Sequence, residues 1–162
     1  MKKHILSVWV ENQAGVLSRV ATLFGELGFN IDSLAVGVTE NSVVARMTIV
    51  TEGSDEMVEA IISKLHQITN LIKVKEIVEG ESVLRELALI MVDALEAKRS
   101  DIINIVEIFR AQIVDVGYNT MTIEISGSKD KVLALEDLLH PFGIREIVRT
   151  GTIAIDRGNR RQ

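Results

Sequence analysis

The chain has no cysteine among its 162 residues and only one proline, Pro141. The lack of cysteine excludes disulfide bonds, thiolate metal sites, iron–sulfur clusters and a cysteine nucleophile. The single proline and the modest glycine content exclude collagen-like and linker-dominated architectures. Aromatic residues make up 4% of the chain, whereas 47% of its residues are hydrophobic. That hydrophobic fraction excludes a disordered chain. The aliphatic surplus indicates either extra surface that is buried between subunits or a dense core.

Long apolar runs are also missing. The run at residues 87–92 is far shorter than the roughly 20 apolar residues that a membrane-spanning helix requires. Near the N-terminus, the apolar stretch 5–10 is interrupted by Glu11 and Asn12, which makes it too short for a signal peptide. The formal net charge is −5, so the chain lacks the general basic character that binding to nucleic acid phosphates needs. We therefore predict a cytoplasmic protein that binds neither membranes nor nucleic acids.

The first half of the sequence alternates strand and helix patterns in the order β-α-β-β-α-β. Short runs of β-branched and aliphatic residues predict strands, whereas apolar residues at helical spacing predict helices. Strands are predicted at residues 5–10, 31–38, 43–51 and 71–78, and helices at residues 16–27 and after Ser54, the expected N-cap. This order is typical of the ferredoxin-like fold.

The second half repeats this order with a shorter second strand and hairpin. Strands are predicted at residues 87–92, 112–116, 121–126 and within 144–155, and helices at residues 102–109 and 131–139. Short landmarks recur, since Gly53-Ser54 has a counterpart in Gly127-Ser128. We therefore predict an α+β protein with two ferredoxin-like βαββαβ domains in tandem. The expected domains are residues 1–80 and 81–162, with the boundary in the polar patch 79–82.

Most sequence motifs of catalysis are absent. The chain has no G-x-G-x-x-G motif, no phosphate-binding loop that ends in Gly-Lys-Ser/Thr, and no G-x-S-x-G motif. His4, His66 and His140 are widely separated and lack the spacing of metal ligands. The paired carboxylates Asp55-Glu56 and Glu136-Asp137 fit solvated helix faces. We therefore predict neither a catalytic residue nor a metal site.

One turn, residues 11–17, has the chemistry of a binding site. It leads from the first strand into the first helix, where the first backbone N–H groups lack partners within the helix and attract an anion. Gly15 permits close approach to the backbone, and Asn12 offers amide donors and an acceptor. A small zwitterion fits, with its carboxylate at the helix start and its ammonium on an amide oxygen. Asn and Gly also occur in such turns only to redirect the chain, so a structural role stays open.

Fragments from both halves resemble the small subunit of acetolactate (acetohydroxyacid) synthase and its ACT domain. In the first half, the resemblance rests on residues 6–8, 15–20, 23–24, 28–34 and 42–49. In the second half, it rests on residues 108–116, so that it spans nearly the whole chain. It implies that residues 1–80 form an ACT domain for effector binding and dimerisation, followed by a C-terminal ferredoxin-like domain.

The resemblance also implies a function in the biosynthesis of the branched-chain amino acids valine and isoleucine. A small subunit of this family is a non-catalytic regulatory subunit that binds the large catalytic subunit and raises its activity. It also confers feedback inhibition by valine or a related amino acid. Thiamine diphosphate, Mg²⁺ and FAD are then expected on the catalytic subunit, with no cofactor in this chain.

The effector site implied by the resemblance lies at the interface of an ACT homodimer. One subunit would contribute Asn12, Ala14, Gly15, Val16 and Leu17, and the facing subunit would contribute Asn30 and Ile31. Val16, Leu17 and Ile31 would form the apolar part of the site. A hydrophobic pocket discriminates one methylene by only about 1–3 kcal/mol, so valine, leucine and isoleucine all remain candidate effectors.

Three other functions stay open. A free-standing ACT-type amino-acid sensor would have the same first turn, and only the second-half fragment favours a synthase subunit. RNA-recognition domains share the strand order but stack bases on aromatic residues of the sheet, whereas here the strand at 43–51 has none. The short basic tail with Arg157, Arg160 and Arg161 fits a frayed C-terminus. A hydrolase of the acylphosphatase kind would need an arginine in the first loop, and residues 11–15 contain none.

Overall fold

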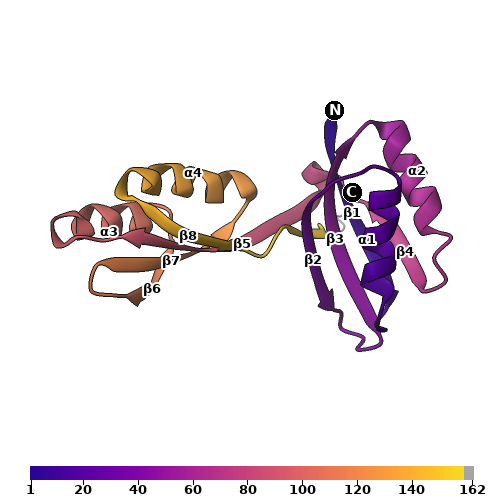
Figure 1. Cartoon of the computed structure of the whole chain (residues 1–162), viewed down its shortest axis with the longest axis horizontal. Helices are drawn as coiled ribbons and strands as arrows, with labels where there is room; N and C mark the ends of the chain where they lie inside the picture. The colour runs from indigo at the N-terminus through magenta and orange to yellow at the C-terminus, as the bar shows by residue number, and fades with distance from the viewer. Residues whose placement is uncertain (159–162) are drawn as a thin grey trace. The chain divides into compact units, whose positions relative to one another are not determined.

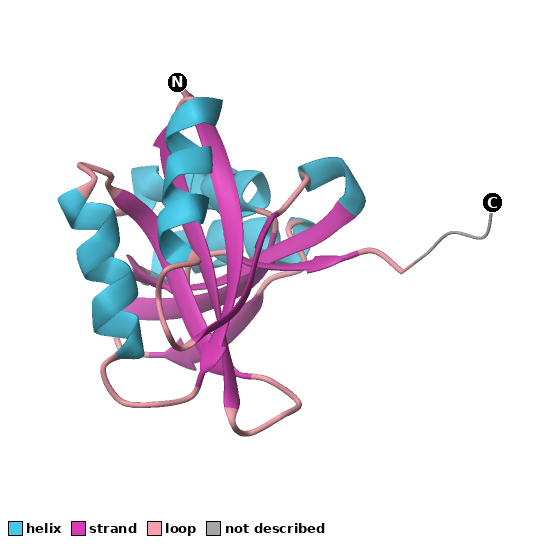
Figure 2. Ribbon diagram, turned by 90° about the vertical axis from the view of Figure 1, so that its right-hand side faces the viewer, coloured by secondary structure: helices cyan, strands magenta, loops and turns pink. Residues whose placement is uncertain are grey.

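The structure is a computed structural model that describes residues 1–158. Arg160 and Arg161 of the predicted basic tail lie outside the described residues. The described residues form two compact units: Met1–Val83 together with residues 152–158, and Leu84–Gly151 (Figure 1). Both units contain an antiparallel sheet and two α-helices (Figure 2). The predicted α+β class with two ferredoxin-like units is therefore confirmed.

The first unit has the strand order β2-β3-β1-β4. Its strands are β1 (Lys2–Glu11), β2 (Ile31–Val38), β3 (Val44–Gly53) and β4 (Leu71–Glu76), and its helices are α1 (Val16–Glu26) and α2 (Asp55–Leu65). β1 and β3 are the central pair and run antiparallel over ten residue pairs from Lys2↔Gly53 to Glu11↔Val44. β2 and β4 are therefore the edges of this sheet.

The core of the first unit follows from the apolar periodicities of its elements. Helix α1 buries Val16, Val20 and Phe24, which are four residues apart and so share one helix face. Helix α2 buries a similar stripe, and alternate residues of β1 and β3 complete the core, including Leu6 and Met47. Each fully buried aliphatic or aromatic side chain contributes about 1.5–3 kcal/mol. This packing fixes both helices on the same face of the sheet.

The second unit repeats the topology with the strand order β6-β7-β5-β8. Its elements are β5 (Ser82–Asp93), α3 (Arg99–Ile108), β6 (Gln112–Val116), β7 (Thr120–Gly127), α4 (Lys129–Leu139) and β8 (Ile144–Arg149). β6 has five residues whereas β2 has eight, which confirms the prediction of a shorter second strand. Short 3₁₀ turns lie at Glu79–Glu81, Glu96–Lys98 and His140–Phe142.

The recurring Gly-Ser pairs mark the same junction in both units. Ser54 is the N-cap of α2, and its Oγ accepts a hydrogen bond from the Met57 amide at 3.3 Å. Ser128 caps α4 in the same way, with its Oγ 3.3 Å from the Lys131 amide. The predicted capping role of Ser54 is confirmed. Each pair therefore ends a strand and begins the helix that follows.

The C-terminal segment differs from the expected division into residues 1–80 and 81–162. Instead of one strand region within 144–155, β8 ends at Arg149, Gly151 adopts a left-handed backbone with φ 80°, and β9 (Ile153–Asp156) is a separate strand that pairs with β5. The segment from Thr152 groups with the first unit, because the Thr152 amide donates to Ser33 Oγ and the Ala154 carbonyl accepts from Arg46. The two units meet in the chain between Val83 and Leu84 and between Gly151 and Thr152.

No helix within residues 1–158 is both long enough and apolar enough to cross a membrane.

The Ser54 cap gives a test of the fold. We expect Ser54→Ala to lower the free energy of unfolding by about 1 kcal/mol, because the Met57 amide loses its acceptor. Denaturant unfolding followed by circular dichroism measures this change. Ser42→Ala, in the exposed turn before β3, is the matched control and should leave the unfolding free energy nearly unchanged. Equal losses in both variants would contradict the capping role.

Candidate functional site

The predicted turn lies between the end of β1 at Glu11 and the start of α1 at Val16. Gly15 is the N-cap of α1 and has φ 85° and ψ −11°, a left-handed conformation that favours glycine. A Cβ atom built at Gly15 would meet no other atom within 4 Å. The outer side of this turn is therefore open, while its backbone conformation disfavours any side chain at this position.

Helix α1 begins without a side-chain cap, unlike α2 and α4. Its first turn contains no acidic residue, and the Val16 amide makes only a long contact of 3.5 Å with the Gln13 carbonyl. The N-terminus of a helix has a partial charge of about +0.5 because its first N–H groups are unpaired within the helix. Among the described residues, nothing neutralises this charge from the first turn. The start of α1 thus has the donors for a carboxylate.

Asn12 lies on the rim of this turn and is exposed. Its Nδ2 donates to the Ser42 carbonyl at 3.1 Å, and its backbone amide donates to the Val43 carbonyl at 2.8 Å. These bonds fix the side-chain amide against the turn between β2 and β3. They use its donor side and leave the Oδ1 oxygen available as an acceptor, the role that an ammonium group requires.

The apolar residues of the predicted site have different surroundings. Val16 is only 2% exposed and belongs to the core between α1 and the sheet, so its side chain does not line the open turn. The expectation that the Val16 side chain forms part of an apolar pocket is therefore corrected, and only its backbone amide faces the helix start. Leu17 is 42% exposed and keeps an accessible apolar side chain. Ala14 is exposed in the turn itself.

Asn30 and Ile31 lie at the other end of the sheet. Ile31 pairs with Thr51, whereas the end of β1 at Glu11 pairs with Val44 at the opposite end of β3. The eleven residues of α1 separate the two positions by roughly 16 Å. Within one chain, therefore, Asn30 and Ile31 do not meet the start of α1. The elements concerned, β2 and α1, are labelled in Figure 1.

The start of β2 is well anchored. The Asn30 carbonyl accepts a hydrogen bond from Thr51 Oγ1 at 2.7 Å, and Asn30 Nδ2 donates to Asp32 Oδ1 at 2.9 Å. Ile31 is half-buried and packs against the core. The Asn30 side chain is exposed and its Oδ1 remains accessible, so it can face a neighbouring molecule.

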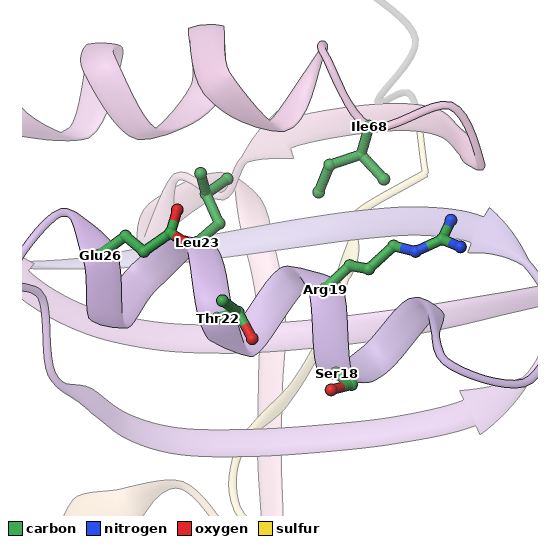
Figure 3. Close-up of a pocket in the computed structure, with 6 residues that line it drawn as sticks. All are labelled: Ser18, Arg19, Thr22, Leu23, Glu26 and Ile68. Atoms are coloured by element: carbon green, nitrogen blue, oxygen red, sulfur yellow. The ribbon is translucent and has the colours of Figure 1, made fainter.

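A surface groove of about 240 Å³ lies elsewhere on the first unit (Figure 3). It is lined by Ser18, Arg19, Thr22, Leu23, Glu26 and Ile68. Arg19 points away from Glu26, and its Nη1 donates to Asn70 Oδ1 at 2.6 Å. The polar groups of this groove do not converge on one point, and none of the predicted site residues lines it.

The sheet face opposite α1 and α2, here called the back face, has polar contacts that the sequence analysis missed. Arg46 stacks over the Trp9 ring at 4.4 Å from its centroid, and its Nη2 donates to Ser7 Oγ at 2.9 Å. Burial lowers the pKa of Arg46, while the carboxylates of Asp156 and Glu40 oppose this shift. The signal in the sequence is the alternation of the polar residues Arg46 and Thr48 with apolar residues along this strand.

Comparisons with known proteins identify the family. A family model described as "AHAS small subunit-like ACT domain" matches residues 6–73, and another described as "Small subunit of acetolactate synthase" matches residues 85–158. The chain is 51% identical to a probable acetolactate synthase small subunit of Archaeoglobus fulgidus, covering 98% of this chain and 99% of that protein. It is 47% identical to the acetolactate synthase small subunit of Mycobacterium leprae, covering 97% and 93%.

A solved structure agrees with these relatives. The crystal structure of the acetolactate synthase small subunit from Thermotoga maritima superposes with a TM-score of 0.92 at 37% identity, covering 98% of this chain and 99% of that one. The predicted resemblance is thus confirmed over both units. The chain belongs to the acetolactate synthase small-subunit family.

Proposed function

We propose that this chain is a non-catalytic regulatory subunit that binds the catalytic subunit of acetolactate synthase, raises its activity and makes it sensitive to valine or a related branched-chain amino acid. Family membership supports the partner. The uncapped start of α1 behind Gly15 is the observation that supports an amino-acid effector. Thiamine diphosphate, Mg²⁺ and FAD are assigned to the catalytic subunit. The test is an acetolactate-forming assay of the catalytic subunit, with and without this chain, across a valine titration.

The effector contacts follow from the groups at the turn. The carboxylate accepts hydrogen bonds from the first amides of α1 at Val16 and Leu17, where the helix charge favours an anion. The ammonium donates to Asn12 Oδ1, and the branched side chain packs on Leu17. Asn30 and Ile31 of the facing subunit close the site.

A homodimer is the simplest way to bring Asn30 to the start of α1. β2 is an edge strand, and its Val36 and Val38 are 45% and 60% exposed although they pair with the core residues Met47 and Ala45. Two edge strands related by a two-fold axis perpendicular to the sheet run antiparallel, so the start of one β2 faces the end of the other. This pairing covers the unpaired edge and the exposed valines, and it moves Asn30 across to the end of the sheet where α1 begins.

Gly15→Asp tests the carboxylate position. The new carboxylate repels that of the effector, and hydrogen bonds to charged groups are worth about 1.5–3 kcal/mol. We therefore expect the valine concentration for half-inhibition to rise by roughly 10- to 150-fold, with activation of the catalytic subunit retained. Asparagine tolerates the left-handed backbone at this position and adds no charge. Gly15→Asn therefore separates the effect of the added charge from the effect of an added side chain. Gly25→Asp, at an exposed position of α1 without positive φ, is the matched control. Wild-type inhibition in Gly15→Asp would refute the site.

Asn30→Ala tests the contribution of the facing subunit. Loss of a neutral hydrogen bond worth about 0.5–1.5 kcal/mol predicts a roughly 2- to 12-fold rise in the half-inhibitory valine concentration, less than for Gly15→Asp. Sedimentation of the variant checks that it still forms the wild-type oligomer. Asn104→Ala, at an exposed position of α3, controls for the loss of a surface amide. An unchanged titration for Asn30→Ala would remove this residue from the site.

The regulatory coupling makes a reciprocal prediction. If valine changes the affinity of this chain for the catalytic subunit, the catalytic subunit must change the valine affinity by the same factor. Calorimetric titrations of valine into the free chain and into the complex measure this factor. Identical valine affinities in both titrations, together with unchanged binding of the catalytic subunit, would contradict coupling through this site.

A further inference from the structure

Residues 152–157, here called the return segment, cover part of the back face of the first sheet. Ser7 and Thr48 are paired across β1 and β3 on this face and are 0% and 3% exposed, although α1 and α2 lie on the other face. In the return segment, Thr152 and Ala154 are buried. The back face therefore owes part of its burial to a segment that follows the second unit in the chain.

The middle of the return segment is held by Arg46. Its Nη2 donates to the Ala154 carbonyl at 2.7 Å as well as to Ser7 Oγ, and its guanidinium plane lies over Trp9. One planar side chain thus joins a strand residue, an aromatic ring and the backbone of the return segment. A lysine has the charge but not the flat, multiple-donor geometry that these contacts use.

The end of the return segment is tied to β4 and to the start of β5. Asp156 forms an ion pair with Lys75 and accepts a hydrogen bond from Ser82 Oγ at 3.1 Å. The hydrogen bond from Lys75 lowers the pKa of Asp156, which keeps the carboxylate charged. The Arg157 amide donates to the Glu81 carbonyl at 2.9 Å. Both chain connections to the second unit are thereby anchored on the first.

The beginning of the return segment contacts the strand that carries the proposed effector residues. The Thr152 amide donates to Ser33 Oγ at 3.0 Å. Ser33 follows Asn30 and Ile31 in β2, and the β2–β3 register shifts between Ile31 and Ser33. Such an irregularity is where a strand changes its twist and direction. Thr152 directly follows Gly151, the last residue of the second unit.

We propose that the return segment couples the effector site to the second unit, with Ser33 and Arg46 as positioning residues. This inference rests on the proposed function. An effector that contacts Asn30 and Ile31 shifts the start of β2, and the Ser33–Thr152 hydrogen bond transfers that shift to the chain that enters the second unit. Arg46 holds the segment at Ala154. A displacement of Thr152 therefore moves the preceding residue, Gly151, and is not absorbed by movement of the residues that follow. An effector shifts an equilibrium only by its differential affinity for two states, and in this proposal the Ser33–Thr152 hydrogen bond links the strand that the effector contacts to the return segment.

The test uses the full chain with the catalytic subunit and compares Ser33→Ala and Arg46→Lys with the wild type. In both variants we expect valine to bind the free chain with an affinity within about twofold of the wild type, while inhibition at saturating valine falls by about half or more. Hydrogen exchange gives a second measurement. Valine should slow exchange in β5 and β8 of the wild-type chain but not of Ser33→Ala. Ser126→Ala, an exposed serine of β7, is the matched control and should behave as wild type.

The outcomes separate this inference from the proposed function. A wild-type chain that neither binds nor responds to valine contradicts the proposed function itself. If the wild type responds and both variants show the same maximal inhibition and exchange pattern, the coupling role is overturned. Loss of valine binding in Ser33→Ala also overturns it, because Ser33 would then act at the effector site directly. Arg46→Lys keeps the positive charge but loses the planar guanidinium contacts. Reduced maximal inhibition in this variant therefore supports a positioning role, whereas wild-type inhibition would show that the charge alone suffices and would overturn the positioning role of Arg46.

Discussion

The proposed function depends on the first backbone N–H groups of α1, which have neither a side-chain cap nor an acidic residue in the first turn. Val16, Val20 and Phe24 fix the helix on the sheet, so its first amides cannot turn toward other partners. Gly15 provides the left-handed residue that admits the chain into this helix without adding a side chain over those amides. Apolar packing thus holds these amides in place, and in the proposed function the carboxylate of the effector accepts their hydrogen bonds.

The corresponding junction of the second unit has different surroundings, although α3 also begins without a side-chain cap. Its first helix, α3, follows a 3₁₀ turn at Glu96–Lys98 and has Asp101 in its first turn, where a carboxylate offsets the helix charge. Arg99 extends from the helix start, donating from Nε to the Ala94 carbonyl and from Nη2 to the Gly117 carbonyl, both at 3.0 Å. Arg99 therefore ties the start of α3 to neighbouring carbonyls, a contact that the start of α1 lacks. The two units share a fold but differ at this junction.

The sequence predicted the elements that local pattern controls and missed those that depend on distant contacts. The helices, the strand order and the Ser54 cap followed from periodicity and capping chemistry. Val16 fitted both the core stripe of α1 and the expected pocket, and only packing decides that it belongs to the core. The place of the return segment depends on Arg46 and Ser33, more than a hundred positions away in the chain, so no local signal in residues 152–157 reveals it. Asn12 and Gly15 were predicted from the chemistry of the first turn, whereas the facing residues Asn30 and Ile31 came from family resemblance.

The return of the chain to its first sheet makes the second unit an insertion rather than an appended module. A gene shortened from its 3′ end would lose the cover of Ser7 and Thr48 before it lost any strand of the second unit. The second unit therefore cannot be removed by C-terminal truncation without also removing the return segment. A version without the second unit would have to join residue 83 to residue 152, which keeps the return segment and its contacts with Arg46 and Ser33.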